Sequence, residues 1–397
     1  MKQKIIDKIN RLASQKEPFL FVINYQADEA FIRKLSDINP EECLFDFEGR
    51  SNWRENHSKE MGDSKRIYEE ISREIPKEIS EKKFFKGTPL DSPISWQITP
   101  PLYNEYERSF NIVKSNIMAG NSYLTNLTNR VPVSCNLSLE EIFHRAKGKY
   151  KLLLRRKRTQ AEDKAHLKEE NIEENLTPFV CFSPETFVRI KGGRIYSYPM
   201  KGTLDASLPN AEKLLMEDRK EAAEHATIVD LIRNDLSRVA EDVRVDKYRY
   251  VDVLHTNKGD ILQTSSEISG RLPEDYPHHL GEILDAQLPA GSITGAPKDK
   301  TMQIIQEAEG YDRGFYTGIM GIYDQGELNS AVMIRFIEEE TSPIDSEADG
   351  EKNFKANEGK KPKESRKLYF KAGGGITSKS DCRREYEEVI QKIYLPF

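Results

Sequence analysis

The sequence predicts an α/β (α+β) fold, because segments with helical and strand-like patterns follow one another along the chain. The N-terminal residues place apolar side chains at helical spacing, and the runs FLFVINY at 19–25 and CLFDFEG at 43–49 are typical of strands. Residues 103–117 again have helical spacing and stop before Gly120, a good helix terminator, and the strand-like run SYLTNLTNRVPV follows at 122–133.

Prolines at 89, 93, 100 and 101 mark a connection between two regions. We expect residues 1–98 to form an N-terminal helix and sheet layer of the same fold as residues 99–397. Two charged insertions are expected in the second region, at about 155–176 and 338–367. The segment 155–174 carries twelve charges in twenty positions, and 338–367 carries sixteen in thirty, between two strand-like runs. The second insertion is therefore predicted to be an overgrown hairpin loop.

Composition excludes several classes of protein. Sixty Lys and Arg against sixty-six Asp and Glu give a net charge of −6, so no nucleic-acid partner is expected. No apolar run is long enough to span a membrane, and the N-terminal segment does not resemble a signal peptide, so a cytoplasmic protein is predicted. The four cysteines lie far apart and predict reduced, buried thiols, and no His or Cys spacing is typical of zinc.

Two isolated ionisable residues stand beside strand-like runs. Glu185 in CFSPETFVRI can be aimed from a strand edge into a cleft that raises its pKa, although a capping carboxylate is the simpler interpretation. Lys201 in YPMKGT lies between a strand and a Gly-Thr turn. A lysine kept from water by apolar neighbours loses its proton more readily and becomes a nucleophile, whereas most lysines are simply exposed.

Two predicted helices each carry a pair of glutamates one turn apart. Glu221 and Glu224 form one pair, and Glu385 and Glu388 form the other. If the pairs converged, their oxygens would suit Mg²⁺ and would leave room for a substrate carboxylate, although such pairs alone are usually solvated helix faces.

A glycine-rich loop, LPAGSITGAPKDKTMQII at 288–305, runs into a predicted helix. It fails the spacing of a phosphate-binding P-loop, because Ala296 stands where the second glycine is required and Lys298 is followed by Asp299. Its backbone N–H groups still suit an anion, as do those of AGGGITS at 372–378. Arg335, placed at the end of a predicted strand, can clamp a carboxylate. Together these features favour a small dicarboxylate bound through Mg²⁺.

Seven segments in order resemble the chorismate-utilising enzymes, which include anthranilate, isochorismate, salicylate and aminodeoxychorismate synthases. These segments are SPE, PMKGT, KEAAEH-x4-DLIRND, PAGSITGAPK, RGFYTGIMG, MIR and AGGGI-x8-EYEE. The resemblance covers about 103–395 apart from the insertions, and it makes 99–397 the chorismate-binding catalytic region. It implies two packed, mostly antiparallel sheets with outer helices and a site between them.

The resemblance also implies a role for each candidate residue. Lys201 would be the nucleophile that attacks chorismate, and Glu185 the general acid that protonates the departing hydroxyl. Mg²⁺ would be the cofactor, held by Glu221, Glu224, Glu385 and Glu388. The remaining candidates would bind substrate, and they are Arg335, Thr294, Gly295, Lys298, Gly373, Gly374 and Gly375.

Within the family, Lys before Gly-Thr is similar to the aminodeoxychorismate synthase branch, whereas the anthranilate and isochorismate enzymes usually have Ala there. Most relatives place Gln or Lys at the position of Leu124, and Lys there serves water attack, so this chain is not expected to be an isochorismate synthase. The resemblance thus implies amination of chorismate with ammonia from a glutamine amidotransferase subunit, since the chain has no Cys-His-Glu glutaminase signature. Anthranilate synthase component I and a catalytically silent chorismate-binding member are the alternatives.

Overall fold

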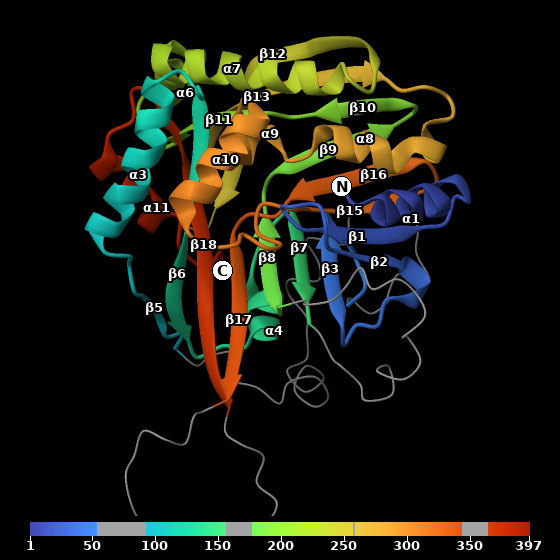
Figure 1. The fold of residues 1–397 in the computed structure, drawn as a ribbon, viewed down its shortest axis with the longest axis horizontal. Helices are drawn as coiled ribbons and strands as arrows, with labels where there is room; N and C mark the ends of the chain where they lie inside the picture. The colour runs from blue at the N-terminus through green and yellow to red at the C-terminus, as the bar shows by residue number, and fades with distance from the viewer. Residues whose placement is uncertain (54–92, 156–176, 257–258, 344–363) are drawn as a thin grey trace, which may run out of the picture.

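The computed structural model describes residues 1–53, 93–155, 177–256, 259–343 and 364–397 (Figure 1). Residues 54–92 and most of both charged insertions lie outside these residues. The described residues form two sheets of nine strands each, and every strand pairing is antiparallel. The predicted fold class, two packed antiparallel sheets with outer helices, is confirmed.

The first sheet carries the strand that contains Lys201. Its order is β11 (Met200–Asp205), β13 (Gly259–Arg271), β10 (Arg194–Ser197), β9 (Thr186–Lys191), β16 (Glu327–Val332), β15 (Ile319–Asp324), β1 (Phe19–Ile23) and β2 (Ala30–Lys34), with β12 (Glu241–Thr256) also paired to β13.

The second sheet carries the glycine-rich strand. Its order is β14 (Gly295–Ala296), β6 (Leu124–Cys135), β18 (Glu364–Thr377), β17 (Phe336–Pro343), β8 (Phe179–Ser183), β7 (Tyr150–Leu154), β3 (Cys43–Phe47) and β4 (Arg50–Ser51), with β5 (Trp96–Ile98) also paired to β6. The described part of residues 1–98 therefore supplies strands to both sheets.

Helices cover the outer faces of the sheets (Figure 1). Residues of α1 (Gln3–Ser14), α7 (Arg219–Leu236) and α8 (Leu280–Gln287) pack on the first sheet. Residues of α3 (Tyr103–Met118), α4 (Leu139–Arg145), α10 (Lys298–Glu309) and α11 (Cys382–Gln391) pack on the second. The shorter elements are α6 (Ala211–Glu217), α9 (Gly291–Thr294) and the 3₁₀ turns η1 (Leu35–Asp37) and η2 (Tyr276–His279).

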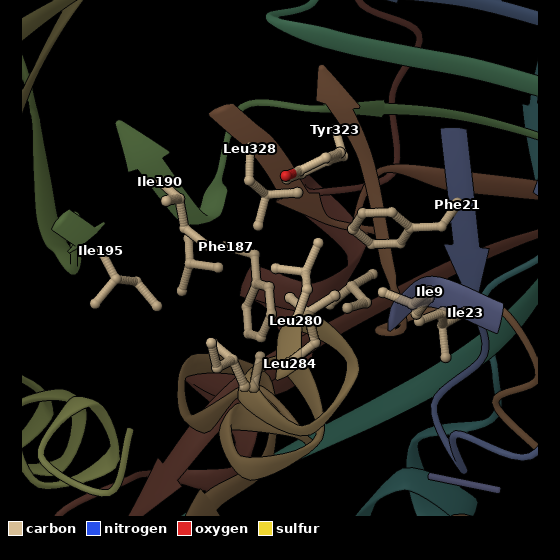
Figure 2. Close-up of a cluster of buried hydrophobic side chains, with 14 of the residues drawn as sticks. Ile9, Phe21, Ile23, Phe187, Ile190, Ile195, Leu280, Leu284, Tyr323 and Leu328 are labelled. Carbon is tan, nitrogen blue, oxygen red and sulfur yellow. The ribbon is translucent and has the colours of Figure 1, made fainter. Parts of the chain in front are cut away.

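The strand-like run of β1 is apolar at every position because successive side chains point to opposite faces of the strand and both faces are buried. In β1, Phe19, Phe21 and Ile23 face the helices, where they join a cluster with Ile9 of α1 and Leu280 of α8 (Figure 2). The alternate residues Leu20 and Val22 face the space between the sheets. Both faces of this strand are buried, so each of its side chains contributes to a core.

The hairpin of β17 and β18 corrects the predicted bounds of the second insertion. The strand pairing runs from Phe336 opposite Lys371 to Pro343 opposite Glu364. Residues 338–343 and 364–367 are thus strand, not loop. Ion pairs accommodate charged side chains there, with Glu338 and Glu340 on Arg130 and Glu339 on Arg366. Residues 344–363 lie outside the described part of the chain.

No helix among the described residues combines the length and the apolarity that a membrane span requires.

Candidate active site

A cavity of about 510 Å³ opens between the ends of the two sheets. Its wall includes residues of β6, β11, β13, α7, α9, β18 and α11 and of the links β8–β9, β16–β17 and α10–β15. The candidate residues that line it are Glu185, Lys201, Glu224, Arg335, Gly373, Gly374, Gly375 and Glu388. Segments far apart in sequence are therefore brought to one place.

Lys201 lies on β11 and projects into this cavity. Its ammonium forms an ion pair with Glu224 of α7, with 2.9 Å between Nζ and Oε2. Burial alone would lower the pKa of Lys201, but the hydrogen bond and charge of Glu224, with the charges of Glu221 and Glu388, raise it above its ordinary value. This corrects the expectation of apolar neighbours and a lowered pKa: the structure holds Lys201 protonated.

The glycine after Lys201 allows α7 to approach β11. Gly202 has φ +78°, and a Cβ there would lie 3.1 Å from Oε2 of Glu221. The pairing of β11 with β13 shifts register between Lys201 and Thr203, as at a β-bulge. The Gly-Thr turn thus aims Lys201 while leaving room for the carboxylate of Glu221.

Glu185 stands in the link between β8 and β9, on the cavity wall. Its carboxylate accepts a hydrogen bond from the hydroxyl of Ser292 on α9. Burial raises the pKa of Glu185 above its ordinary value, opposed by the Ser292 hydrogen bond and the charge of Arg335. The predicted strand-edge position and raised pKa are both present, as a general acid working near neutral pH requires.

The four glutamates proposed as metal ligands come from α7 and α11. Glu224 and Glu388 line the cavity, whereas Glu221 and Glu385 do not, and the charges of Glu224, Glu221 and Glu388 all raise the pKa of Lys201. Their oxygens have the donor chemistry that Mg²⁺ prefers. Within the described residues, however, no three acidic, His or Cys side chains are close enough to share a metal ion, and Lys392 pairs with Glu388 at 2.8 Å. The carboxylates are suitable ligands for Mg²⁺, but before they can bind it Lys201 must release Glu224 and Lys392 must release Glu388.

Arg335 follows β16 and precedes β17, so it does not end a strand as predicted. Its φ of +56° is unusual for a residue other than glycine, and such strain often accompanies a functional side chain. The guanidinium lies 5.5 Å from the ring centroid of Tyr394. Among the described residues it has no ion-pair partner, which leaves its planar fork available for a ligand carboxylate.

The glycine-rich loop is placed partly as predicted. Ser292 and Ile293 line the cavity, whereas Thr294, Gly295 and Lys298 do not. Lys298 is engaged elsewhere, at 2.8 Å from Asp235 and 2.9 Å from the carbonyl of Gln287. A direct substrate contact by these three residues is thus not supported by the geometry.

Gly295 and the glycines of β18 allow close backbone packing. A Cβ at Gly295, whose φ is +127°, would lie 1.8 Å from the carbonyl oxygen of Leu124. A Cβ at Gly373 would lie 2.7 Å from the carbonyl oxygen of Leu127, and one at Gly374 would lie 3.5 Å from Oε2 of Glu385. The glycines therefore bring the strands together and keep the cavity floor open.

Sequence reasoning missed several residues of the cavity wall. They include Asn126, Gln263, Ser292, Tyr316, Lys371 and Lys392. Lys392 also donates to the carbonyl of Gly373 at 3.0 Å. The segments GSITG, RGFYTG and KAGGG contained three of these residues, but nothing in their patterns distinguished side chains that face the cavity from those that face the core.

The arrangement suits a small acidic substrate. Lys201, Arg335 and other cations on the wall attract carboxylates, and Glu185 can supply a proton to a leaving group. A lysine, a carboxyl group with a raised pKa and an arginine in one cavity are the groups that covalent substitution on an organic acid would require.

Comparison with known proteins defines the family. The model of a family described as chorismate binding enzyme matches residues 1–350, so the chain belongs to this family. Members of it are enzymes that act on chorismate, and the resemblance seen in the sequence is confirmed at this level.

Two curated relatives match along almost the whole chain. A Haemophilus influenzae protein named "uncharacterized PabA-like protein" is 41% identical over 394 residues, 99% of this chain and 97% of its own length. A Pasteurella multocida protein with a similar name is 40% identical, with 98% of both chains covered. Anthranilate synthase component 1 of Aquifex aeolicus is 34% identical over 222 residues, 53% of this chain and 38% of that protein.

Solved structures share the fold at low sequence identity. The menaquinone-specific isochorismate synthase of Escherichia coli superposes with a TM-score of 0.57 at 16% identity, covering 98% of this chain and 90% of that one. Anthranilate synthase component I of Streptococcus pneumoniae gives 0.50 at 24% identity, covering 76% and 59%. These similarities support the two-sheet architecture alone.

Proposed function

We propose that the protein is aminodeoxychorismate synthase component I, which converts chorismate and ammonia to 4-amino-4-deoxychorismate for 4-aminobenzoate and folate synthesis. The observation that carries the proposal is the position of Lys201. It stands before the Gly-Thr turn, where the amination branch of the family is expected to have lysine, and its side chain lines the same cavity as Glu185.

The reaction is two linked substitutions. The neutral amine of Lys201 forms a bond to C2 of chorismate, the two conjugated ring double bonds shift towards C4, and the C4–O bond breaks. Glu185 donates its proton to the departing oxygen, which leaves as water. Ammonia then bonds to C4, both ring double bonds return to their original positions, and the C2–N bond to Lys201 breaks, so the net change is chorismate plus ammonia to product plus water. Dividing one difficult step into two lowers the barrier of each.

Lys201 must lose a proton before it attacks. Its ion pair with Glu224 holds that proton, and the carboxylate at 2.9 Å is positioned to receive it. Because the pKa of Lys201 is raised, only a small fraction of it is neutral at pH 7, and raising the pH increases that fraction while it removes the proton that Glu185 must donate.

The carboxylate groups of chorismate are assigned to two places. Arg335 takes the pyruvyl carboxylate, because its guanidinium has no ion-pair partner among the described residues. Mg²⁺, held by Glu221, Glu224, Glu385 and Glu388, would neutralise the ring carboxylate when bound. Calorimetric titration with Mg²⁺ checks the ligand set: Glu224→Gln and Glu388→Gln should each weaken binding, and unchanged affinity in both would exclude it.

Ammonia is supplied from a separate glutamine amidotransferase subunit or from free ammonium. Full activity with glutamine should therefore require such a subunit, whereas ammonium at alkaline pH should support activity by the chain alone.

The product assay tests the proposal. Purified protein is incubated with chorismate, Mg²⁺ and ammonium, and the products are separated by chromatography. The wild type should form aminodeoxychorismate, Lys201→Ala should not, and Lys213→Ala should, since Lys213 is an exposed lysine of α6.

Anthranilate synthase component I is the second candidate, favoured by the similarity to the Aquifex aeolicus protein. It would release anthranilate and pyruvate in the same assay, and detection of those products would replace the first proposal. No turnover with ammonium, or with glutamine and an amidotransferase, would favour a silent chorismate-binding protein.

A further inference from the structure

A buried ion pair lies behind the cavity wall. Arg313 and Glu309 have side chains only 2% and 1% exposed. The guanidinium donates from Nε to one carboxylate oxygen at 2.8 Å and from Nη2 to the other at 2.6 Å. Glu309 is the last residue of α10, and its carboxylate also accepts from the backbone N–H of Thr128 on β6 at 2.7 Å.

The remaining N–H groups of Arg313 reach two segments of the cavity wall. Nη1 donates to the carbonyl of Ile293 on α9 at 3.0 Å and to the hydroxyl of Thr317 at 3.3 Å. Nη2 donates to the carbonyl of Asn126 on β6 at 2.7 Å. All five guanidinium N–H groups therefore have acceptors, and Ile293 and Asn126 both line the cavity.

Further bonds tie the same segments together. The side-chain amide of Asn126 donates to the carbonyl of Ile293 at 3.0 Å, so this oxygen accepts twice. Lys371, a buried residue of the cavity wall on β18, donates to the carbonyl of Arg313 at 2.9 Å and pairs with Glu338 at 2.7 Å. α9, β6 and β18 are thus connected through one buried pair.

The residue before Ile293 contacts the proposed general acid. Ser292 donates its hydroxyl to the carboxylate of Glu185, and both belong to the cavity wall. α9 is a single short turn, so the orientation of Ser292 depends on what holds its backbone. Arg313 donates to the carbonyl of Ile293, the residue that follows Ser292 in the chain.

We propose that Arg313 and Glu309 are a positioning pair for catalysis: they fix the α9 turn so that Ser292 orients the carboxyl of Glu185. Arg313 acts through Ser292 and does not touch substrate. The proposal rests on the proposed function only for the role given to Glu185. Lysine cannot replace arginine here, because an ammonium has three donors and no planar fork.

The test compares Arg313→Lys, Ser292→Ala and their double variant. Arg313→Lys should lower kcat about tenfold, as a small misplacement of a catalytic group does, with KM for chorismate nearly unchanged. Ser292→Ala should act in the same direction. The kcat of the double variant should be little lower than that of the worse single variant, because both substitutions disrupt the same positioning of Glu185 through Ser292. If the losses in kcat of the two single variants multiply in the double variant, the proposal is overturned. It is also overturned if a rise in KM accounts for the loss of activity.

A second readout does not depend on turnover. The Ser292 hydrogen bond lowers the pKa of Glu185, so its loss should raise that pKa. Carbon-13 NMR of labelled glutamate, with the Glu185 signal assigned by Glu185→Gln, should show the upward shift in Arg313→Lys and in Ser292→Ala. If the wild type makes no aminodeoxychorismate but both variants shift Glu185, the pair is upheld and the proposed function fails. If the wild type is active and neither variant shifts the pKa of Glu185, the positioning role of Arg313 and Glu309 is rejected.

Controls separate positioning from folding. Lys151→Met removes another buried cation that donates to two carbonyls, at 3.1 Å from Phe143 and 3.0 Å from Ala146, away from the cavity wall. It should leave both the titration of Glu185 and KM unchanged, and a shift equal to that of Arg313→Lys would mean a general effect of destabilisation. If Arg313→Lys does not fold, Glu309→Gln keeps the shape of the pair and is expected to change Glu185 in the same direction.

Discussion

The ammonium of Lys201 and the carboxylate of Glu224 form an ion pair 2.9 Å long inside the cavity. The lysine belongs to β11 and the glutamate to α7, so the pair joins a strand to the helix that covers it. Its consequence is chemical: the proposed nucleophile is held in its protonated form, and the acidic surroundings stabilise a positive charge where the amine must later react.

Lys201 should titrate at higher pH than an exposed lysine. Its raised pKa means that the ion pair stabilises the fold fully below the unfolded pKa of about 10.4 and that this stabilisation is lost as pH rises through the folded value. Carbon-13 NMR of reductively methylated protein follows the titration of Lys201 and of the exposed Lys213 in one experiment. Lys201→Ala assigns the Lys201 signal. A titration of Lys201 below that of Lys213 would contradict the ion pair as described.

Glu185→Gln should strongly reduce turnover and stabilise the fold at neutral pH. Loss of a general acid costs about 10²- to 10⁴-fold in rate. Because burial raises the pKa of Glu185, the native state binds more protons than the unfolded state between the ordinary value and the raised one. Stability therefore falls as pH rises through that window, and the neutral amide avoids this loss.

Thermal unfolding of the wild type and Glu185→Gln from pH 4 to pH 8 checks the stability claim. The difference in melting temperature should grow with pH in favour of the variant. A variant that is less stable than the wild type at pH 8 would show that ionised Glu185 stabilises the native fold.

Arg335→Gly and Arg335→Ala should separate binding from backbone strain. Both remove the guanidinium, and loss of a charge-assisted carboxylate clamp should weaken chorismate binding about 10- to 100-fold. Glycine tolerates the φ of +56°, whereas alanine keeps the strain. Arg335→Gly should thus be at least as stable as Arg335→Ala by denaturant unfolding. If both variants bind chorismate as tightly as the wild type, Arg335 is not part of the binding site.

Gly202→Ala and Gly192→Ala form a matched pair of substitutions. Both glycines have positive φ, +78° and +57°, but only at Gly202 would the new Cβ meet a neighbour, Glu221 at 3.1 Å. Gly192→Ala should cost only the backbone strain of about 1 kcal/mol and leave turnover intact. Gly202→Ala should also lower activity, because it moves α7 or the strand that carries Lys201, and normal activity of a folded Gly202→Ala would contradict the close approach.

The architecture was largely predictable because it rests on local patterns. The apolar run FLFVINY and the helical spacing of 103–117 appear in the structure as β1 and α3. The cavity position of Glu185 and Lys201 also followed from their neighbours in sequence, through the resemblance to the family.

The environment of each group was less predictable. Neighbours in sequence suggested apolar surroundings for Lys201, but its surroundings are set by α7 and α11, which approach from distant segments. Ser292 gave no signal, since a serine in a glycine-rich loop is ordinary, and only the approach of α9 to the β8–β9 link places it on Glu185. Long-range contacts thus decided the charge states that the chemistry needs.

The covalent step tests the central claim most directly. The protein is mixed with chorismate and Mg²⁺ without ammonia, quenched rapidly, and analysed by intact mass and peptide mapping. We predict an adduct with the mass of chorismate less one water, located on Lys201, that disappears when ammonium is added and is absent in Lys201→Ala. Formation of aminodeoxychorismate by Lys201→Ala at the wild-type rate, with no adduct in either protein, would contradict the account.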